Sequence, residues 1–296
     1  MDRVVKFLAY DGKVSVIVAE TTELAEYIRN LHDLSPTMTA AMGRFSTIVG
    51  MMGLSDTKEN SSRITVQLKG DGPAGTLVGI VRRDDNISKI KAYAENPQVE
   101  PPLKSNGKLD VGAAVGSHGY LNIIKKSLDT DAVYNGVVTL TSGEIAEDFT
   151  KYFAESEQKP TVIALGVLVN SSGVVSSGGY MINLMPDAGE EEISKIETAI
   201  SNVKNVSNLI SDGMTVEEIA KLVTGDENVK VIEDDLKIVY ECDCSREIFE
   251  RGLISLGRKQ LEEIIESDHK ADVVCHFCNK QYHFSEDELK LLIENL

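Results

Sequence analysis

The stretch "YECDCSRE" (residues 240–247) places two cysteines one residue apart in a chain that contains four. The other two lie in "VVCHFCNK" (residues 273–280), where two residues separate them. All thiols of the chain therefore belong to two tight pairs near its C-terminal end. The pairs are Cys242 with Cys244 and Cys275 with Cys278.

The two cysteine pairs together form a metal-ligand pattern. C-x-x-C is the knuckle spacing in which a turn directs both sulfurs to one point. In "KIVYECDC" (residues 237–244) the alternation of side chains places the other two cysteines on one face of an expected strand. Four thiolates and no competing cysteine favour one tetrahedral Zn²⁺ per chain. We therefore predict Cys242, Cys244, Cys275 and Cys278 as the zinc ligands of the reduced protein.

Three histidines lie near the cysteines in the sequence: His269, His276 and His283. Because four sulfurs already complete a tetrahedral ligand set, the histidines are not needed as ligands. We expect these histidines at the surface, or in contact with the cysteine ligands without binding the metal themselves.

A zinc ion would also stabilise the segment that carries the cysteines. The helices expected after Cys244 and at the end of the chain can bury few apolar side chains. A unit below about 70–80 residues commonly needs a disulfide or a metal for stability. The binding energy of zinc would then become folding energy. We predict a zinc-binding domain over residues 229–296.

The spacing of the cysteines also suggests a switch. Each cysteine has a partner close enough in sequence for a local disulfide, so oxidation could dismantle the site without rearranging the chain. Closing Cys242–Cys244 and Cys275–Cys278 costs the least loop entropy. The C-x-C ring is very small, which should strain its disulfide and keep it reducible.

Composition limits the class of protein. The 296 residues are 42% hydrophobic and 26% charged, as in soluble globular proteins. The opening "MDRVVKFLAYDGK" has no apolar leader, and no apolar run reaches membrane-spanning length. We expect a cytosolic protein with reduced thiols. The net charge of −17 repels nucleic acid and anionic lipid, and no basic block in the sequence counters it.

The rest of the chain predicts a core and a linker. "VVKFLAYDGKVSVIVAE" (residues 4–20) indicates a hairpin, and two helices should follow it, the second starting at Pro36. Met38, Met42, Met51 and Met52 are expected to fill the core. The stretch "SDTKENSSR" (residues 55–63) should be a loop. The segment from "VGAAVGSHGY" (residues 111–120) onward should continue the strands.

Two further helical segments carry capping signals. Thr141 and Glu144 form an expected capping box for a helix that ends before Pro160. Its acids Glu144, Glu147 and Asp148 suit a helix N-terminus and a solvated face. After Pro186, apolar residues recur at helical spacing, followed by a capping box at Thr215 and Glu218 and a stop at Gly225. These helices need an apolar partner outside their own segment.

Motifs for nucleotide binding and nucleophilic catalysis are weak. Gly70-x-Gly72-x-x-Gly75 contains Pro73 and leads into a strand, so we predict a β-turn. There is no GxxxxGK[ST] motif for ATP. Ser117 and His118 are neighbours without an identifiable acidic partner, which favours a surface histidine. We expect no enzyme activity.

With these motifs, the sequence resembles the heat-shock protein 33 family, the redox-regulated 33-kDa chaperonins. The resemblance runs nearly end to end and includes "QLKGDGPAGTL", "TSGEIAEDFTKYFAESEQKPTVIALGVLVN", "SSGGYMINLMPDA", "CDC" and "CHFC". It implies an α+β fold: an N-terminal α/β core with β-sheets and packed helices (1–185), a helical linker (186–228) and a small C-terminal four-cysteine zinc domain (229–296).

The resemblance also implies a function. The family suggests an ATP-independent holdase that binds unfolding client proteins under oxidative stress, idle when reduced and active when oxidised. An oxidised homodimer and a reduced monomer are expected. Two alternatives stay open: a thiol–disulfide oxidoreductase that uses Cys275 and Cys278, and a zinc-stabilised adaptor or nucleic-acid-binding protein.

Overall fold

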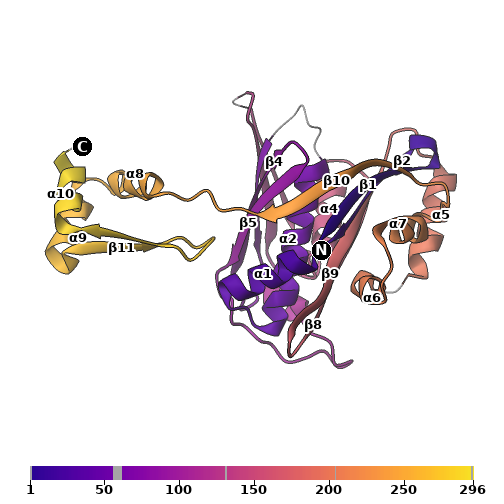
Figure 1. The fold of residues 1–296 in the computed structure, drawn as a ribbon, viewed down its shortest axis with the longest axis horizontal. Coiled ribbons are helices and arrows are strands. Elements are labelled where there is room, and N and C mark those ends of the chain that lie inside the picture. Colours follow the sequence, from indigo (N-terminus) through magenta and orange to yellow (C-terminus); the bar gives the residue numbers. More distant parts are fainter. Residues whose placement is uncertain (1, 56–61, 131, 204, 295) are drawn as a thin grey trace. The chain divides into compact units, whose positions relative to one another are not determined.

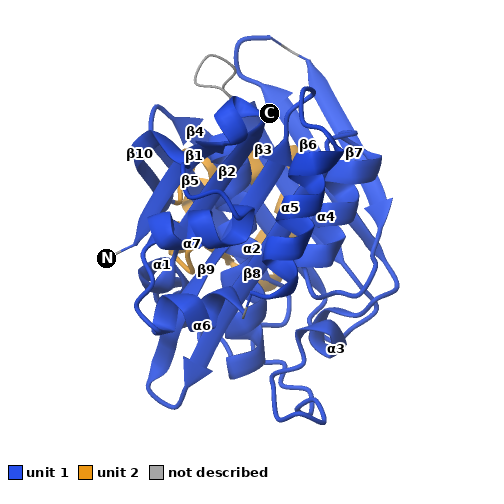
Figure 2. Cartoon of the chain, turned by 90° about the vertical axis from the view of Figure 1, so that its right-hand side faces the viewer, with its two compact units in different colours: residues 1–241 blue, residues 242–296 orange. Residues whose placement is uncertain are grey.

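The computed structural model describes residues 2–55, 62–130, 132–203, 205–294 and 296. The predicted loop at 55–63 lies largely outside the described residues. Within them the chain forms two compact units, Met1–Glu241 and Cys242–Leu296. Figure 1 shows the elements along the chain, and Figure 2 colours the two units.

A ten-stranded sheet forms the centre of the first unit, in the order β7-β6-β3-β4-β5-β10-β1-β2-β9-β8. Its pairs are antiparallel apart from β10 with β5, which is parallel. The strands are β1 (Arg3–Ala9), β2 (Val14–Glu20), β3 (Ser62–Lys69), β4 (Thr76–Asp84), β5 (Ile87–Ala94), β6 (Tyr120–Ser127), β7 (Val133–Thr139), β8 (Thr161–Asn170), β9 (Gly173–Leu184) and β10 (Lys230–Tyr240).

The predicted hairpin of the first residues is confirmed. β1 pairs with β2 in continuous register, and the short 3₁₀ turn η1 (Tyr10–Gly12) joins them. Asp11 adopts a left-handed backbone with φ 51°, a conformation that Asp tolerates well in turns. Val14–Ala19 of β2 are buried without interruption, because helices cover both faces of this part of the sheet.

One face of the sheet packs on the helices α1 (Thr22–His32), α2 (Pro36–Ser55) and α4 (Ala146–Glu155), and the short helix α3 (Val111–Val115) packs on α2. The twenty-residue α2 is buried almost all round, so its apolar residues show no single stripe. The four methionines predicted as core filling are all buried there. This prediction is confirmed.

The opposite face, over β1, β2 and β9, carries α5 (Glu190–Ser201), α6 (Val206–Ser211) and α7 (Val216–Thr224) (Figure 1). Ile196, Leu209 and Ile219 are buried against this face. The prediction that these helices need an outside apolar partner is confirmed. So is the capping box of α7, in which the Thr215 hydroxyl accepts from the Glu218 N–H at 3.2 Å.

The boundary between the compact units differs from the one expected at residue 229. β10, expected to open the zinc domain, belongs to the large sheet, where it pairs with β1 over its first part and with β5 over Lys237–Tyr240. Ile238 packs closely against Gly50 of α2, where an added Cβ would lie 2.5 Å from its Cγ2. β10 therefore joins the two halves of the sheet, and the second compact unit begins at Cys242.

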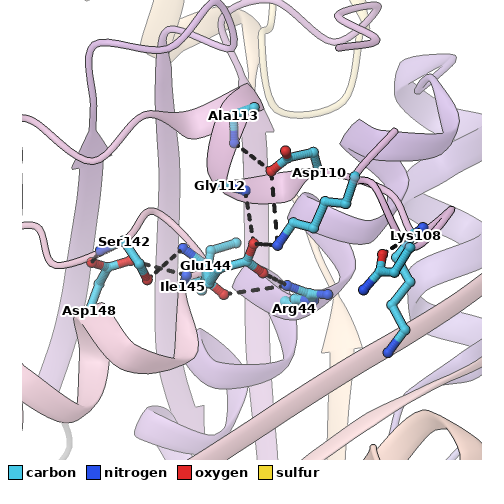
Figure 3. A network of polar contacts seen from close by, with 11 residues as sticks. Arg44, Lys108, Asp110, Gly112, Ala113, Ser142, Glu144, Ile145 and Asp148 are labelled. Atoms are coloured by element: carbon cyan, nitrogen blue, oxygen red, sulfur yellow. Dashed lines mark hydrogen bonds and ion pairs between the residues drawn. The ribbon is translucent and has the colours of Figure 1, made fainter. Parts of the chain in front are cut away.

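Two local predictions in the first unit are wrong. Residues 111–115 form the short helix α3, and β6 begins only at Tyr120. The helix expected from Thr141 begins at Ala146, because Ile145 has a positive φ of 74° and interrupts the helical path. The Asp148 carboxylate, which is buried and not solvated, accepts from the N–H groups of Thr141, Ser142 and Ile145 (Figure 3).

Glu144, predicted as part of the capping box, has a different role. Its carboxylate forms ion pairs with Lys104 and with Arg44 of α2, the latter at 2.7 Å, and accepts from the Gly112 N–H (Figure 3). Burial acts to raise the pKa of Glu144, but Lys104 and Arg44 outweigh it and lower that pKa overall. The residue ties the turn before α4 to α2 and α3.

The remaining motifs behave as predicted. The segment between Gly70 and Gly75 is a turn joining β3 and β4, without a helix to receive a pyrophosphate. The His118 side chain is 86% exposed. Asp71 lies near it, a partner that the sequence did not reveal, but both Asp71 and Ser117 contact the same ring nitrogen, Nδ1. No proton relay through the imidazole can be built from that arrangement.

The second unit is a two-stranded hairpin with three helices. It contains α8 (Arg246–Leu256), α9 (Arg258–Asp268), β11 (Lys270–Val274), β12 (Gln281–Ser285) and α10 (Glu286–Glu294). Its buried apolar cluster is small and consists of Leu253, Leu261, Tyr282, Phe284, Leu289 and Ile293. The α+β fold class with a small four-cysteine unit is thus confirmed. Among the described residues, no helix has the length and apolarity needed to cross a membrane.

Candidate metal centre

The first cysteine pair lies in an extended segment at the start of the second unit. β10 ends at Tyr240, so Cys242 and Cys244 do not continue a strand as "KIVYECDC" suggested. Ser245 then occupies the N-cap position of α8 in an extended conformation. The pairing of β10 with β5 ends at Tyr240, opposite Ile90, and the chain leaves the sheet there although β5 continues to Ala94. The two sulfurs nevertheless face the same site, because residues i and i+2 of an extended chain point the same way.

The second pair lies on the tight turn that joins β11 to β12. The Cys275 N–H donates to the Lys280 carbonyl at 2.9 Å, and the N–H groups of Asn279 and Cys278 donate to the Cys275 carbonyl at 2.7 and 3.3 Å. Asn279 adopts the left-handed φ of 58° that this turn needs. The turn brings both sulfurs to one point, as the C-x-x-C spacing indicated. It does not open a helix.

The four sulfurs converge. Their Sγ atoms all lie within 4.8 Å of one another. Cys242 Sγ lies 3.7 Å from Cys275 Sγ, and Cys244 Sγ lies 3.4 Å from Cys278 Sγ. Ligands at the usual Zn–S distance of about 2.3 Å in a tetrahedron are separated by about 3.8 Å. The spacing and the all-thiol donor set therefore fit a tetrahedral metal ion such as Zn²⁺, and the four cysteines are positioned to hold a metal.

The cysteines are partly shielded from solvent. Cys275 is buried and the other three are half-buried. Burial raises the pKa of the Cys242 and Cys278 thiols. Burial also acts to raise the pKa of Cys244, but hydrogen bonds to Tyr282 and Cys278 outweigh it and lower that pKa overall. A cluster of four thiols in this setting resists full ionisation unless a cation compensates the charge.

Tyr282 is a neighbour of the site that sequence reasoning missed. Its hydroxyl donates to the Cys244 carbonyl and lies within hydrogen-bonding distance of Cys244 Sγ, both at 3.2 Å. Its ring packs against Phe249 of α8 with centroids 4.7 Å apart. The signal was present in the sequence, since the alternation in "QYHF" places Tyr282 and Phe284 on one face of β12. Tyr282 thus connects the metal-ligand residues to the apolar cluster.

The nearby histidines and acids are not part of the cluster. His269 pairs with Glu286 at 3.0 Å and His283 with Asp272 at 2.7 Å, and all four lie at the surface of the unit. His276 is exposed on the turn. In the part of the chain that the structure describes, the four cysteines make up the one cluster of metal-ligating side chains found.

Comparisons with known proteins agree with this arrangement. The family model described as "Hsp33 protein" matches residues 2–285. A relative from Clostridioides difficile, named "33 kDa chaperonin", is 42% identical and aligns over 100% of this chain and 99% of its own. Relatives with the same name from Acetivibrio thermocellus and Staphylococcus aureus are 43% and 39% identical and are covered over 97% and 99% of their lengths.

A solved structure gives the same result. The crystal structure of the 33 kDa chaperonin (heat shock protein 33 homolog) from Thermotoga maritima matches with a TM-score of 0.87 and 32% identity. The match covers 99% of this chain and 98% of that one. Because the family model, the relatives and the solved structure agree over nearly the whole length, this chain belongs to the Hsp33 chaperonin family.

Proposed function

We propose that this chaperonin-family protein is a redox-regulated, ATP-independent holdase and has no enzyme activity. The observation that carries the proposal is the convergence of all four thiols within 4.8 Å in a unit with a small apolar cluster. A unit of that kind is folded while the thiols hold a cation and loses stability when they cannot. The redox state of four sulfur atoms would thus control how much of the chain is folded.

In the reduced protein, Cys242, Cys244, Cys275 and Cys278 would bind one Zn²⁺ as thiolates. The bound ion would supply no chemistry beyond charge compensation and a fixed geometry, because four protein ligands leave no open position for a substrate. In this state the zinc-domain residues from Cys242 onward stay folded. The linker helices α5–α7 stay on the sheet, and the apolar surface beneath them stays covered.

Oxidation would remove the ligands. Two thiolates and one peroxide, with two protons from solvent, give one disulfide and two waters, so two peroxide equivalents convert all four sulfurs. We propose the pairs Cys242–Cys244 and Cys275–Cys278, because these close the shortest loops. In the folded unit the cross-pair sulfurs also lie 3.4 and 3.7 Å apart. Peptide mapping therefore discriminates: mainly cross-pair disulfides would contradict the proposed pairing.

Unfolding caused by loss of the ligands would spread into the linker. β10 follows α7 in the chain and ends at Tyr240, so unfolding from Cys242 onward would destabilise the strand that follows the linker helices in the sequence. Release of α5–α7 would uncover the buried apolar residues of β1, β2 and β9 together with the helices' own apolar faces. Large exposed apolar surfaces bind unfolding polypeptides and also promote self-association. A homodimer is therefore expected on oxidation and a monomer in the reduced state, in the cytoplasm under oxidative stress.

A direct test combines activity with zinc release. Reduced and peroxide-treated protein are compared for suppression of client aggregation without ATP, while a chromogenic chelator follows zinc in the same samples. We expect suppression only after treatment, with one zinc released per chain. The variant Cys242→Ser/Cys275→Ser lacks two of the four ligands, so it should suppress aggregation without peroxide, and peroxide should change its activity little. Insulin reduction by the reduced protein, or metal analysis that finds no zinc, would contradict the proposal.

A further inference from the structure

The outward face of strands β3 to β7 carries many cations, which is unexpected in a protein with a net charge of −17. The helices α2 and α4 contact the other face of these strands, and α5–α7 contact β1, β2, β8 and β9 instead. The alternating burial of β3, β4 and β5 shows which side chains point outward. Among these strands' outward positions, the acid is Asp84, at the end of β4, and the cations are Arg63, Lys69, Arg82, Lys89, Lys91 and Lys126.

Four of these cations form one row across four strands. Arg63 on β3 pairs in register with Lys126 on β6 and with Arg82 on β4, and Arg82 pairs with Lys89 on β5. Neighbouring strands lie about 4.7–4.9 Å apart, so the row places four cations over about 14 Å. Like charges directly opposite each other destabilise a sheet. We call Lys126, Arg63, Arg82 and Lys89 the cationic row.

The two ends of the cationic row differ in their compensation. Lys89 pairs with Asp84 at 2.8 Å, and both Lys89 and Arg82 pair with Glu241. Arg63 and Lys126 are exposed, and the described residues place no carboxylate within ion-pair distance of either. Among the residues that the structure describes, this half of the row therefore has no carboxylate partner.

The rows beside the cations are largely aliphatic and polar. The next row contains Ile124 and Ile80 on either side of Thr65 and ends at Lys91, and the one after it contains Val137, Val78 and Tyr93. Val137, on the edge strand β7, is 58% exposed. The face thus joins a cationic stripe to an aliphatic one. Bases of a single-stranded nucleic acid would need aromatic side chains for stacking. The outward aromatic residues are Tyr93 and Tyr120, which lie in the third and fourth rows and not beside the cationic row, and the net charge of −17 opposes nucleic acid.

We infer that this face binds acidic amphipathic helical segments of client polypeptides. Acids at i, i+3 or i+4 on one face of a helix are separated by about 4.5–6 Å along its axis, close to the strand spacing of the cationic row. A helix lying across the strands would place acids over the row and apolar residues over Ile124 and Ile80. The face would also offset the repulsion between a client acidic segment and a chaperone of net charge −17. This inference rests on the proposed holdase function.

The test uses two fluorescent probe peptides of equal length and apolar content. One carries four glutamates on one helical face and the other carries glutamines there. Peroxide-treated full-length protein should bind the acidic peptide about tenfold more tightly, which corresponds to about 1.4 kcal/mol, and salt should reduce the difference. The variant Arg63→Glu/Lys126→Glu should abolish the preference. The control Lys108→Glu/Lys230→Glu changes exposed cations outside the face by the same total charge and should retain it.

Unchanged thermal unfolding of both variants verifies that they fold, and Arg63→Gln/Lys126→Gln repeats the test without charge reversal. Equal binding of both peptides by the wild type overturns the inference, and so does equal loss in the control. Binding of a single-stranded oligonucleotide in preference to the acidic peptide also overturns it. Aggregation suppression is measured in the same samples, so failure of the holdase function is seen separately from loss of the acidic preference.

Discussion

The two compact units obtain their stability from different sources. The first unit buries long runs of β2 and α2 in two apolar clusters, one on each face of a ten-stranded sheet. The second, from Cys242 to Leu296, buries six side chains in its apolar cluster and gathers all four thiols. A domain with a large core stays folded when one interaction is lost, whereas a domain with a small core depends on a bound metal or a disulfide. The contrast explains why a chemical signal at four sulfurs could unfold the second unit and leave the sheet of the first unit folded.

Removal of the metal-ligand set should have the largest effect. Cys275→Ser deletes the most buried ligand, and structural zinc contributes apparent binding energies of ~10–16 kcal/mol in small zinc peptides. We expect residues 242–296 to lose cooperative folding and α5–α7 to loosen, while the sheet and the helices α1–α4 of the first unit stay folded. Calorimetry and far-UV circular dichroism check this. Ser255→Ala, at an exposed position of α8, is the control for a general effect of substitution in the second unit.

A cavity in the first core should have a smaller and confined effect. Phe45 of α2 is fully buried and contacts Phe149 edge-to-face with centroids 6.3 Å apart. Phe45→Ala should lower the free energy of unfolding of the first unit by ~3–5 kcal/mol and leave the zinc content unchanged. Denaturant unfolding and metal analysis provide the two readouts. Loss of zinc in this variant would show that the units are not independent in their folding.

The attachment of α5 should weaken in acid. Glu192 pairs with Lys13 at 2.6 Å and accepts from the Gly189 N–H at the start of α5. The hydrogen bond from Lys13, followed by that from Gly189, lowers the pKa of Glu192 from 4.5 to about 2. Because the folded-state pKa is depressed, the stabilisation is present above about pH 4.5 and is lost as the pH falls toward 2.

Hydrogen exchange of α5 at several pH values, corrected for intrinsic rates, measures this loss. Glu192→Gln removes the titrating group, so α5 in this variant should be less protected at neutral pH and should vary less between pH 4.5 and 2. Glu197→Gln, on the exposed face of the same helix, is the matched control. If the two variants respond alike, the Lys13 pair does not hold α5.

The smallest expected effect concerns Tyr282. Tyr282→Phe keeps the ring against Phe249 and removes the hydroxyl that contacts Cys244. Loss of one hydrogen bond costs about 1 kcal/mol, so zinc release by peroxide should accelerate roughly fivefold. Stopped-flow measurement with a chelator gives the rate. An unchanged rate would assign Tyr282 to packing alone.

The sequence predicted elements whose causes are local. The β1–β2 hairpin, the buried methionines of α2 and the cap of α7 follow from alternation, apolarity and capping residues close in the chain. The spacing of Cys275 and Cys278 likewise predicted a turn that aims two sulfurs at one point. Such features need no knowledge of the strand order.

Features that depend on distant partners were missed. β10 looked like the start of the zinc domain because its pairing with β1 and β5 spans most of the chain. The cationic row could not be predicted from the sequence, because its members come from four strands and local patterns do not give the strand order. The capping role passed from Thr141 to Asp148 because a positive φ at Ile145 shifted the start of α4.

The central claim is that oxidation unfolds the second unit first and the linker helices next. Hydrogen–deuterium exchange with mass spectrometry, on reduced and peroxide-treated protein over a time course, tests it most directly. The account predicts that protection is lost first across residues 242–296, then across α5–α7, and that β1–β9 and α2 retain theirs. Oxidised protein that keeps full protection in residues 242–296 while suppressing aggregation would contradict the account.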